Sequence, residues 1–514
     1  MSYTENASKR KDIILALGLF LGGLGLYART LVPGLLPGDS GEFQTLAALL
    51  GHTHPTGYPV YLVLAHPFTR LPLRDVAYRV NLFSAVMAAL TVAGVYLAGR
   101  GLTRYRAAAL ASAVVLAFSP TFWSQALIAE VYTPGAAFFI AVLGVLLAWS
   151  RTRRHELLFV AGLLGGLSLG VHMTVALLAP AVLLFLLLEV GKDHRAWGMA
   201  VAGALLGVAM TLALFAWVDA RDAPADYFRL VVGPSAGAWD LQPEDVDGVW
   251  ERLRFDWTAQ QFRPFMGRWD VLSKQAGWYV RHLPGEIGVP MLVAALVGLL
   301  GLLWARPRVG GFLLTALAVQ WLFVFTYAIW DLYVFCIPGY ILLLLLGAAG
   351  LDTVVRGAAR WGHERGGAVV ASALLLLVIL TLPFLSQART AVVHGETPSF
   401  PFEEYPEYDA HLHERARGLV THLPQNAILL TDWDMLWPYA YVAYLEENRP
   451  DLTFIETRPR DDRPEIAHSL VNYVRARMGD HPIFLDEREN RFRREGFRLV
   501  PMRVGGTRLY RLKR

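Results

Sequence analysis

The sequence predicts an α-helical protein that crosses a membrane many times and ends in a small α/β domain outside the membrane. Of the 514 residues, 55% are hydrophobic and only 18% are charged, whereas soluble domains carry about 25% charged residues. The mean hydropathy is +0.39. The apolar residues form long uninterrupted blocks, and the region 387–514 has a different pattern. These observations exclude a soluble enzyme, a disordered chain and a fibrous repeat.

About eleven segments have the composition of membrane spans, because a spanning helix needs about 20 mostly apolar residues. These segments are 13–33, 80–99, 107–119, 131–149, 157–170, 172–190, 196–218, 285–304, 310–329, 332–351 and 367–386. Lys9, Arg10 and Lys11 precede the first segment as they would in a signal peptide. The segment lacks an A-x-A cleavage motif, so we interpret it as a retained anchor.

The positive charges predict the orientation. If the N-terminus is cytoplasmic, five inside loops contain basic residues. The short outside loops after helices three, five and nine contain no Lys or Arg. This distribution agrees with the positive-inside rule. The inside loops carry Arg100, Arg104 and Arg106; Arg151, Arg153 and Arg154; Lys192 and Arg195; Arg306 and Arg308; and Arg356, Arg360 and Arg365. A span at Tyr58–Leu71 would reverse every later loop, so this segment is predicted to be re-entrant or interfacial.

This topology predicts a multi-pass protein of the plasma or inner membrane. Residues 1–386 form the transmembrane domain, with outer loops 34–79 and 219–284, and residues 387–514 form the outer domain. The net charge of +4 is explained by the loops and does not indicate a nucleic-acid partner. The single cysteine, Cys336, excludes an intrachain disulfide.

The tail alternates strand and helix patterns. Ala427–Thr431, Leu452–Glu456 and Pro482–Asp486 resemble short strands, and Met435–Glu447 and Pro464–Met478 resemble helices. This alternation is typical of a parallel sheet. The tail lacks clustered acid and base candidates in the sequence, so it is not expected to carry chemistry.

The first outer loop contains the strongest candidates for chemistry. Asp39 and Glu42 are three residues apart at the start of a helical pattern. They fit a helix N-cap closed by a capping box, and they also fit a catalytic pair, because a capping carboxylate can still face a substrate. In the stiff turn that follows, His52 and His54 have no third metal ligand at a recognisable spacing, so we expect no metal and no cofactor. Either histidine could donate to a phosphate.

Further polar residues lie near the outer ends of the predicted spans. Charged groups within a span cost about 2.5–3.5 kcal/mol each at mid-membrane, so their presence needs a reason. Interfacial anchoring explains each one singly, and their common side favours a shared polar cavity. The residues are Arg79, Asn81, Glu130, Tyr132, His172 and Asp331.

Several motifs resemble a family of multi-spanning proteins that includes membrane O-mannosyltransferases. The longest is GDSGEFQTLAALLGHTHPTGYPVYLVLAHPFTRLP, which starts at Gly38; Thr56 stands where the family usually has a second proline. Others, in chain order, are Tyr78–Ser84, Ala129–Thr133, Gly166–His172, Asp331–Pro338, Leu423–Thr431 and Arg449–Asp451. The family in turn resembles type C glycosyltransferases, which use polyprenyl-phosphate sugars and carry an acidic motif in the first outer loop. The resemblance implies that Asp39 is the catalytic base, with Glu42 beside it.

The predicted function is therefore transfer of a sugar, such as mannose, from a polyprenyl-phosphate donor to a protein or glycan acceptor, with inversion. Arg79 is the first candidate to stabilise the leaving phosphate because it is always charged, and His54 is the second. Two alternatives stay open: a secondary transporter or lipid flippase, and a non-catalytic membrane assembly protein. Transporters commonly show internal repeats and helices broken at the midplane, neither of which the sequence indicates.

Overall fold

The computed structural model describes residues 3–380, 382, 384–402, 405–460 and 462–514. The chain divides into two compact units, each assembled from three separate stretches. The first comprises Met1–Leu31, Leu82–Thr211 and Phe265–Tyr405, and the second Val32–Asn81, Leu212–Pro264 and Pro406–Arg514. The two large loops predicted outside the membrane are thus grouped largely with the tail. The domain boundary at 386/387 remains a prediction.

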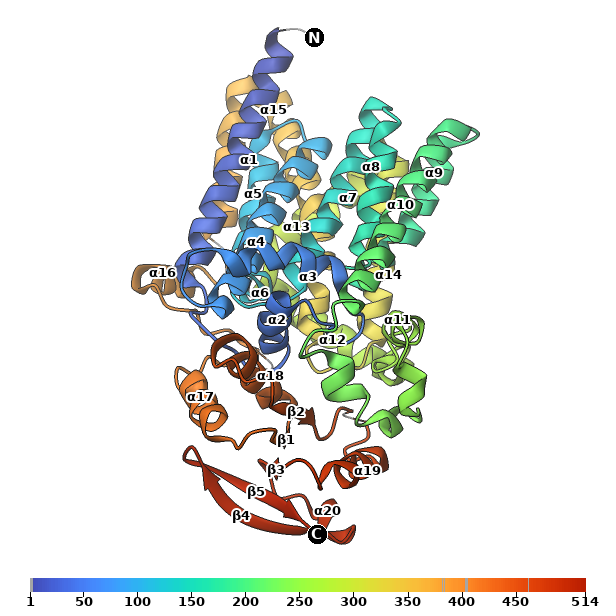
Figure 1. Ribbon diagram of the computed structural model, residues 1–514. Helices are drawn as coiled ribbons and strands as arrows, with labels where there is room; N and C mark the ends of the chain where they lie inside the picture. The colour runs from blue at the N-terminus through green and yellow to red at the C-terminus, as the bar shows by residue number, and fades with distance from the viewer. Residues whose placement is uncertain (1–2, 381, 383, 403–404, 461) are drawn as a thin grey trace. The chain divides into compact units, whose positions relative to one another are not determined.

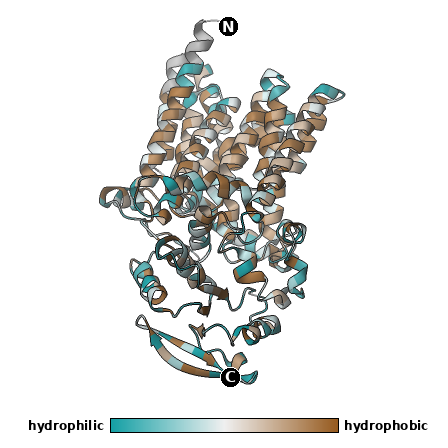
Figure 2. Ribbon diagram, viewed as in Figure 1, coloured by the Kyte–Doolittle hydropathy of each residue, from teal (hydrophilic) through white to brown (hydrophobic). Residues whose placement is uncertain are grey.

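Long helices dominate the first unit, and they are largely hydrophobic along their length (Figures 1 and 2). The helices of this part of the chain are α1 (Tyr3–Thr30), α4 (Val76–Leu102), α5 (Arg106–Ala117), α6 (Pro120–Ala126), α7 (Tyr132–Thr152), α8 (Glu156–Ser168), α9 (Ala179–Val190), α10 (His194–Asp219), α12 (Leu272–Ile287), α13 (Val289–Ala305), α14 (Pro307–Thr326), α15 (Ile337–Leu380) and α16 (Leu385–His394). The protein is therefore a helical polytopic membrane protein, as predicted.

Within the described residues, seven helices are long and apolar enough to cross a membrane, or nine if two bent pairs each count as one span. The bends are 64° between α5 and α6 and 105° between α12 and α13. Pro120 begins α6, and Gly288 with Pro290 begins α13; such residues interrupt the helical hydrogen-bond ladder. The predicted number was eleven. The predicted spans 157–170 and 367–386 coincide with shorter apolar stretches, Glu156–Ser168 and Val369–Val378, and residues 381 and 383 of the latter span lie outside the described residues.

Small residues bring α13 and α15 into close contact. A Cβ placed on Gly298 would lie 1.9 Å from the carbonyl oxygen of Leu346, and one on Gly350 would lie 1.8 Å from that of Ala294. Glycines at such positions let two helix backbones approach, which is the usual way that membrane helices gain packing energy.

The second unit contains a mixed five-stranded sheet with the order β2-β1-β3-β5-β4. Strands β1 (Ile428–Thr431), β2 (Thr453–Glu456) and β3 (Ile483–Leu485) are parallel, with Ile428 opposite both Thr453 and Ile483. The three strands and the parallel sheet predicted for the tail are confirmed. The antiparallel hairpin of β4 (Arg498–Val504) and β5 (Thr507–Lys513) was not predicted. Its turn is Gly505–Gly506, a pair that favours tight hairpins.

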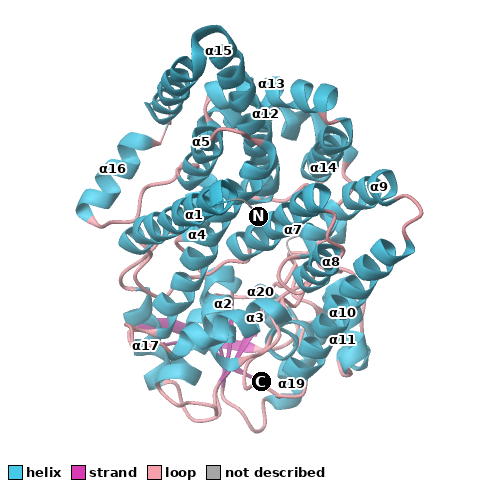
Figure 3. Cartoon of the chain, turned by 90° about the horizontal axis from the view of Figure 1, so that it is seen from above, coloured by secondary structure: helices cyan, strands magenta, loops and turns pink. Residues whose placement is uncertain are grey.

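The strands are drawn in magenta in Figure 3, and all five fall between residues 428 and 513. The helices of the tail are α17 (Leu412–His422), α18 (Trp433–Tyr441), α19 (His468–Arg477) and α20 (Asn490–Arg494). Leu470, Val471 and Val474 of α19 pack with Ile428 and Ile455 in one buried cluster. Such a cluster provides the tail with its own hydrophobic core.

The first outer loop of this unit forms short helices. They are α2 (Gly38–Leu49), α3 (Pro59–Ala65) and a 3₁₀ turn, His66–Arg70. At 1.5 Å per residue, the seven residues of α3 are too few to cross a membrane. This agrees with the prediction that Tyr58–Leu71 does not span. The second outer loop contributes α11 (Val249–Trp257).

Candidate active site

Asp39 lies in the first turn of α2, with its side chain 45% exposed. The residue at the N-cap is Pro37, and no side chain caps the helix. The predicted capping box is therefore wrong, because the helix begins at Gly38, so Asp39 lies inside its first turn and Glu42 is not the third residue after the N-cap. Asp39 Oδ1 instead accepts a hydrogen bond from the indole Nε1 of Trp433 at 2.6 Å. The carboxylate is fixed by the tail and still open to an approaching group.

Glu42 is fully buried one turn further along α2. Its Oε1 accepts the backbone N–H of His54 at 2.8 Å, and its Oε2 lies 2.5 Å from Nδ1 of the same residue. Burial raises the pKa of Glu42, and the charge and hydrogen bonds of His54 oppose that rise. The donor and acceptor roles in the Oε2–Nδ1 contact depend on the tautomer of the ring. Glu42 thereby fixes both the backbone and the ring of His54.

His54 connects the two carboxylates and is enclosed by aromatic rings. Its Nε2 lies 3.9 Å from Asp39 Oδ2 and 3.5 Å from the hydroxyl of Tyr58. The ring is buried. Five aromatic rings have centroids 5.3–6.5 Å from that of His54: Phe43, Tyr58, Tyr227, Phe262 and Trp433. A low-dielectric enclosure of this kind strengthens electrostatic interactions within it.

Two further carboxyl groups, those of Asp434 and Asp256, lie close to glycines of the first outer loop. A Cβ on Gly38 would lie 3.3 Å from Asp434 Oδ1, and one on Gly57 would lie 2.5 Å from Asp256 Oδ2. Burial raises the pKa of Asp434, and the charges of Asp432 and Asp39 raise it further.

Asp256, on α11, is fully buried. Burial raises its pKa well above the usual range, and the nearby charge of Glu42 adds to this effect. Within the described part of the chain, neither of its carboxyl oxygens has a hydrogen-bond partner. Three carboxyl groups around this site, those of Glu42, Asp256 and Asp434, thus have raised pKa values.

Arg79 and Asn81 hold the first outer loop together. The Arg79 guanidinium donates to the carbonyl oxygens of Leu73, Thr69 and Arg74. Asn81 donates to the carbonyl of Val32 at 3.0 Å and accepts from the amide of Gln44 at 2.9 Å. All three nitrogens of Arg79 are thus engaged with its own loop, and its role at a leaving phosphate remains a prediction.

The other predicted site residues belong to the first unit, and three of them form one group. The Tyr132 hydroxyl donates to Asp331 Oδ2 at 3.0 Å, and the rings of Tyr132 and His172 have centroids 5.3 Å apart. His172 Nδ1 is 2.5 Å from the hydroxyl of Thr174. Glu130 is also buried, and its backbone N–H donates to the Ser84 hydroxyl at 3.4 Å. Their predicted role in substrate binding remains a prediction.

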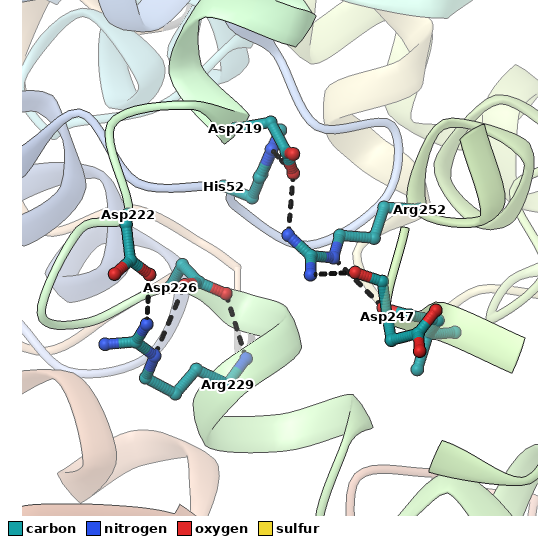
Figure 4. Close-up of polar contacts among 8 residues, drawn as sticks. His52, Asp219, Asp222, Asp226, Arg229, Asp247 and Arg252 are labelled. Atoms are coloured by element: carbon teal, nitrogen blue, oxygen red, sulfur yellow. Dashed lines mark hydrogen bonds and ion pairs between the residues drawn. The ribbon is translucent and has the colours of Figure 1, made fainter. Parts of the chain in front are cut away.

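His52 takes part in a second charged cluster of the second unit (Figure 4). Asp219 Oδ1 lies 3.0 Å from His52 Nε2 and accepts from Arg252 Nη1 at 2.8 Å. These residues line a cavity of about 220 Å³ together with Asp226 and Arg229, which is also paired with Asp222. Each of the two arginines therefore has an aspartate partner. Among the described residues, no group of three or more His, Cys, Asp or Glu side chains could hold a metal ion.

The whole fold is similar to that of ArnT from Cupriavidus metallidurans, whose crystal structure contains undecaprenyl phosphate. The identity is 12% and the TM-score 0.54, covering 99% of this chain and 98% of that chain. The archaeal oligosaccharyltransferase AglB from Archaeoglobus fulgidus, in complex with an inhibitory peptide and a dolichol-phosphate, has 12% identity and a TM-score of 0.57, covering 94% of this chain and 70% of AglB. The protein is thus a polytopic membrane protein with an ArnT-like fold.

The sequence comparisons find similarity to proteins named O-mannosyl-transferases. Residues 39–195 match the family described as Protein O-mannosyl-transferase TMEM260 N-terminal domain. The chain is 23% identical over 476 residues to Protein O-mannosyl-transferase TMEM260 of Mus musculus, covering 86% of this chain and 62% of the mouse protein. It is 28% identical over 152 residues to Protein O-mannosyl-transferase tmem260 of Dictyostelium discoideum, covering 29% of this chain and 18% of that protein. The resemblance indicated by the sequence motifs is confirmed.

Several residues at this site were missed by sequence reasoning. Trp433 and Asp434 belong to the tail, which was expected to carry no chemistry, and Tyr227 and Asp256 belong to the second outer loop. Trp433 is 394 residues from Asp39 in the chain, so no spacing rule could connect them. The aromatic residues at 433 and 437, just after the first strand of the tail, were the available signal.

Proposed function

We propose that this protein is an integral membrane glycosyltransferase that transfers mannose from a polyprenyl-phosphate donor to a protein or glycan acceptor on the outer face, with inversion. The observation that carries the proposal is the half-exposed carboxylate of Asp39 beside the buried Glu42–His54 pair. It is supported by the ArnT-like fold, by the polyprenyl phosphates present in the ArnT and AglB structures, and by similarity to proteins named O-mannosyl-transferases.

In the proposed reaction, Asp39 accepts the proton of the acceptor hydroxyl as the oxygen attacks the anomeric carbon. The new bond forms as the bond between that carbon and the phosphate oxygen breaks, and polyprenyl phosphate leaves with the electron pair. Trp433 orients the base through its indole N–H. The exposed fraction of Asp39 leaves room for the acceptor, whereas buried Glu42 has no such access.

His54 is the proposed electrostatic partner of the reaction. In its protonated form it donates from Nδ1 to Glu42 and presents the N–H of Nε2 toward the side of Asp39. A fixed cation or donor beside the reacting groups stabilises the charge that develops on a leaving phosphate. The engaged guanidinium of Arg79 holds the loop in place.

Complementation of cells that lack the gene tests the proposal. Asp39→Asn removes the proton acceptor and keeps the size of the side chain, so surface O-mannose measured by mass spectrometry should fall by about 10²–10⁴-fold in initial rate. Asp480→Asn, at an exposed residue of the same unit, should restore normal levels. Full activity of an Asp39→Asn protein at normal expression would contradict the proposed base and favour a transporter, a flippase or an assembly protein.

A further inference from the structure

The first unit contains a cavity of about 460 Å³ at the C-terminal ends of α4, α7 and α13, beside the middle of α15. Arg151 stands at the C-terminal end of α7, whereas Tyr132 stands at its N-terminal end. The cavity therefore lies at the opposite end of α7 from the Tyr132–Asp331 pair. Its lining contains six arginines: Arg100, Arg104, Arg151, Arg306, Arg356 and Arg360.

The lining contains one carboxylate, that of Asp352, beside these six guanidinium groups, and both of its oxygens already have partners. Asp352 Oδ1 accepts the backbone N–H groups of Arg104 and Tyr105 at 2.7 Å, and Oδ2 lies 2.9 Å from Arg356 Nε. Arg100 is paired outside the lining, with Asp12 at 3.1 Å. Internal partners thus neutralise two of the arginines and leave the cavity strongly cationic.

Arg306 and Arg151 are two of the four lining arginines without a carboxylate partner among the described residues; Arg104 and Arg360 are the others. Arg306 donates to the carbonyl of Gly101 at 3.2 Å. Within the described residues, no carboxylate forms an ion pair with Arg306 or Arg151. Burial lowers the pKa of Arg306, the charge of Arg151 lowers it further, and the charge of Glu189 opposes both effects. An anion placed between the two would relieve this repulsion.

Small side chains leave space inside the cavity. Gly298, Gly301 and Ala305 of α13 and Ala349 of α15 are part of its lining. A compact anion can therefore reach several guanidinium groups at once. Arginine presents its N–H groups in a fork that matches phosphate oxygens, and basic pockets between membrane helices bind phosphate-bearing lipid headgroups.

We propose that this cavity is a binding site for a phosphate group at the membrane surface, supplied by the headgroup of an anionic phospholipid or by free inorganic phosphate. The cavity lies at the ends of helices that span the membrane, which is the level of lipid headgroups. The surrounding loops are the basic loops predicted to face the cytoplasm. The site is separate in residues from the proposed active site and does not depend on the proposed function.

The test is binding of a fluorescent short-chain phosphatidic acid to the full-length protein in phosphatidylcholine nanodiscs. We expect Arg151→Gln and Arg306→Gln each to weaken binding at least tenfold. Arg154→Gln is the matched control, because Arg154 lies three residues after Arg151 and just beyond α7, is 69% exposed and does not line the cavity. The affinity of this variant should equal that of the wild type. Arg151 is an exposed residue, so the Arg151→Gln variant keeps the test valid if Arg306→Gln does not fold.

Competition separates the two sources of phosphate. If a lipid occupies the site, unlabelled phosphatidic acid displaces the probe and millimolar inorganic phosphate does not. Displacement by inorganic phosphate at a similar concentration assigns the site to the free ion. Equal binding by the wild type, Arg151→Gln and Arg154→Gln would overturn the proposal. An equal loss of binding in Arg151→Gln and Arg154→Gln would show only an effect of general surface charge and would also overturn it.

Discussion

His54 and Glu42 form a two-point contact: the buried carboxyl group accepts the backbone N–H of the histidine through Oε1 at 2.8 Å, and its Oε2 lies 2.5 Å from the ring Nδ1. The two residues are twelve positions apart, so this contact closes the turn between α2 and α3. It also sets which ring nitrogen is directed toward Asp39. The geometry of the candidate site therefore depends on a residue that has no access to a substrate.

Glu42→Gln should lower both the stability of the protein and its transfer rate, although the substitution only replaces a carboxyl group with an amide. The amide has one oxygen, so its NH₂ group would face one of the two His54 donors. An unsatisfied buried donor costs about 1–3 kcal/mol, and a displaced ring should lower the transfer rate by up to about 10²-fold. Melting temperature and transfer rate measure the two effects. Glu465→Gln, at an exposed residue, is the control; wild-type values for Glu42→Gln would show that the contact has no functional role.

Trp433→Phe tests whether the tail positions the proposed base. The variant loses the 2.6 Å hydrogen bond to Asp39 Oδ1 and keeps an aromatic ring near His54. Because Asp39 is 45% exposed, water partly replaces the lost donor, and we expect a reduction of about tenfold in turnover with little change in stability.

Trp437→Phe is the matched control for this prediction. Trp437 lies on the same helix, and its indole N–H has no hydrogen-bond partner within the described part of the chain. Its replacement should reduce packing and leave turnover per folded molecule unchanged. Equal turnover in the two variants would mean that Trp433 contributes only packing.

Gly57→Ala should distort the turn that presents His54. Gly57 has φ +80°, which disfavours a side chain, and its new Cβ would lie 2.5 Å from Asp256 Oδ2. We expect a loss of at least about 1 kcal/mol in stability. Adding Asp256→Ala should recover part of it, because the clash is removed and the backbone strain stays. Thermal melting of the two single variants and the double variant measures the coupling, and strictly additive losses would exclude the close approach.

Stability should fall as the pH rises from about 4 to 8. Burial raises the pKa of Glu456 to about 8 and that of Asp486 to about 7, whereas unfolded carboxyl groups titrate near about 4. The folded state therefore holds more protons between these values, and its advantage is fully present below the unfolded pKa and lost as the pH passes the folded pKa. Melting temperatures from pH 5 to 9 should decline, and Glu456→Gln should flatten the curve. A rise in melting temperature over this interval would contradict the raised pKa values.

The sequence predicted the parts of this protein that depend on local periodicity. The strands at residues 428–431, 453–456 and 483–485 were found within one residue of their ends, because short apolar runs are bounded by turns. The predicted span 107–119 ends at the break before Pro120, but α6 beyond that break was not predicted. The break at Gly288 lies inside the predicted span 285–304 and was missed because hydropathy averages across a bend. The sequence predicted Asp39 and Glu42 as site residues but placed them in a capping box. In the structure, Asp39 contacts Trp433 and Glu42 contacts His54. Such contacts depend on tertiary packing, which spacing does not encode.

The orientation in the membrane is the last prediction, and it rests on the arginines in alternate loops. In a Cys336→Ser background, cysteine at Ser399 in the tail should react with an impermeant thiol reagent in intact cells. Cysteine at Thr152, beside Arg151 and Arg153, should react only after the membrane is opened. Ser399 and Thr152 are both exposed, so a difference between them reports the side of the membrane.

Basic loops are retained in the cytoplasm, which places Arg151 inside and, after an N-terminal span, Asp39 outside. Labelling of Thr152→Cys in intact cells, with Ser399→Cys protected, would reverse this topology. Asp39 would then face the cytoplasm, and an acceptor on the outer face could not reach it.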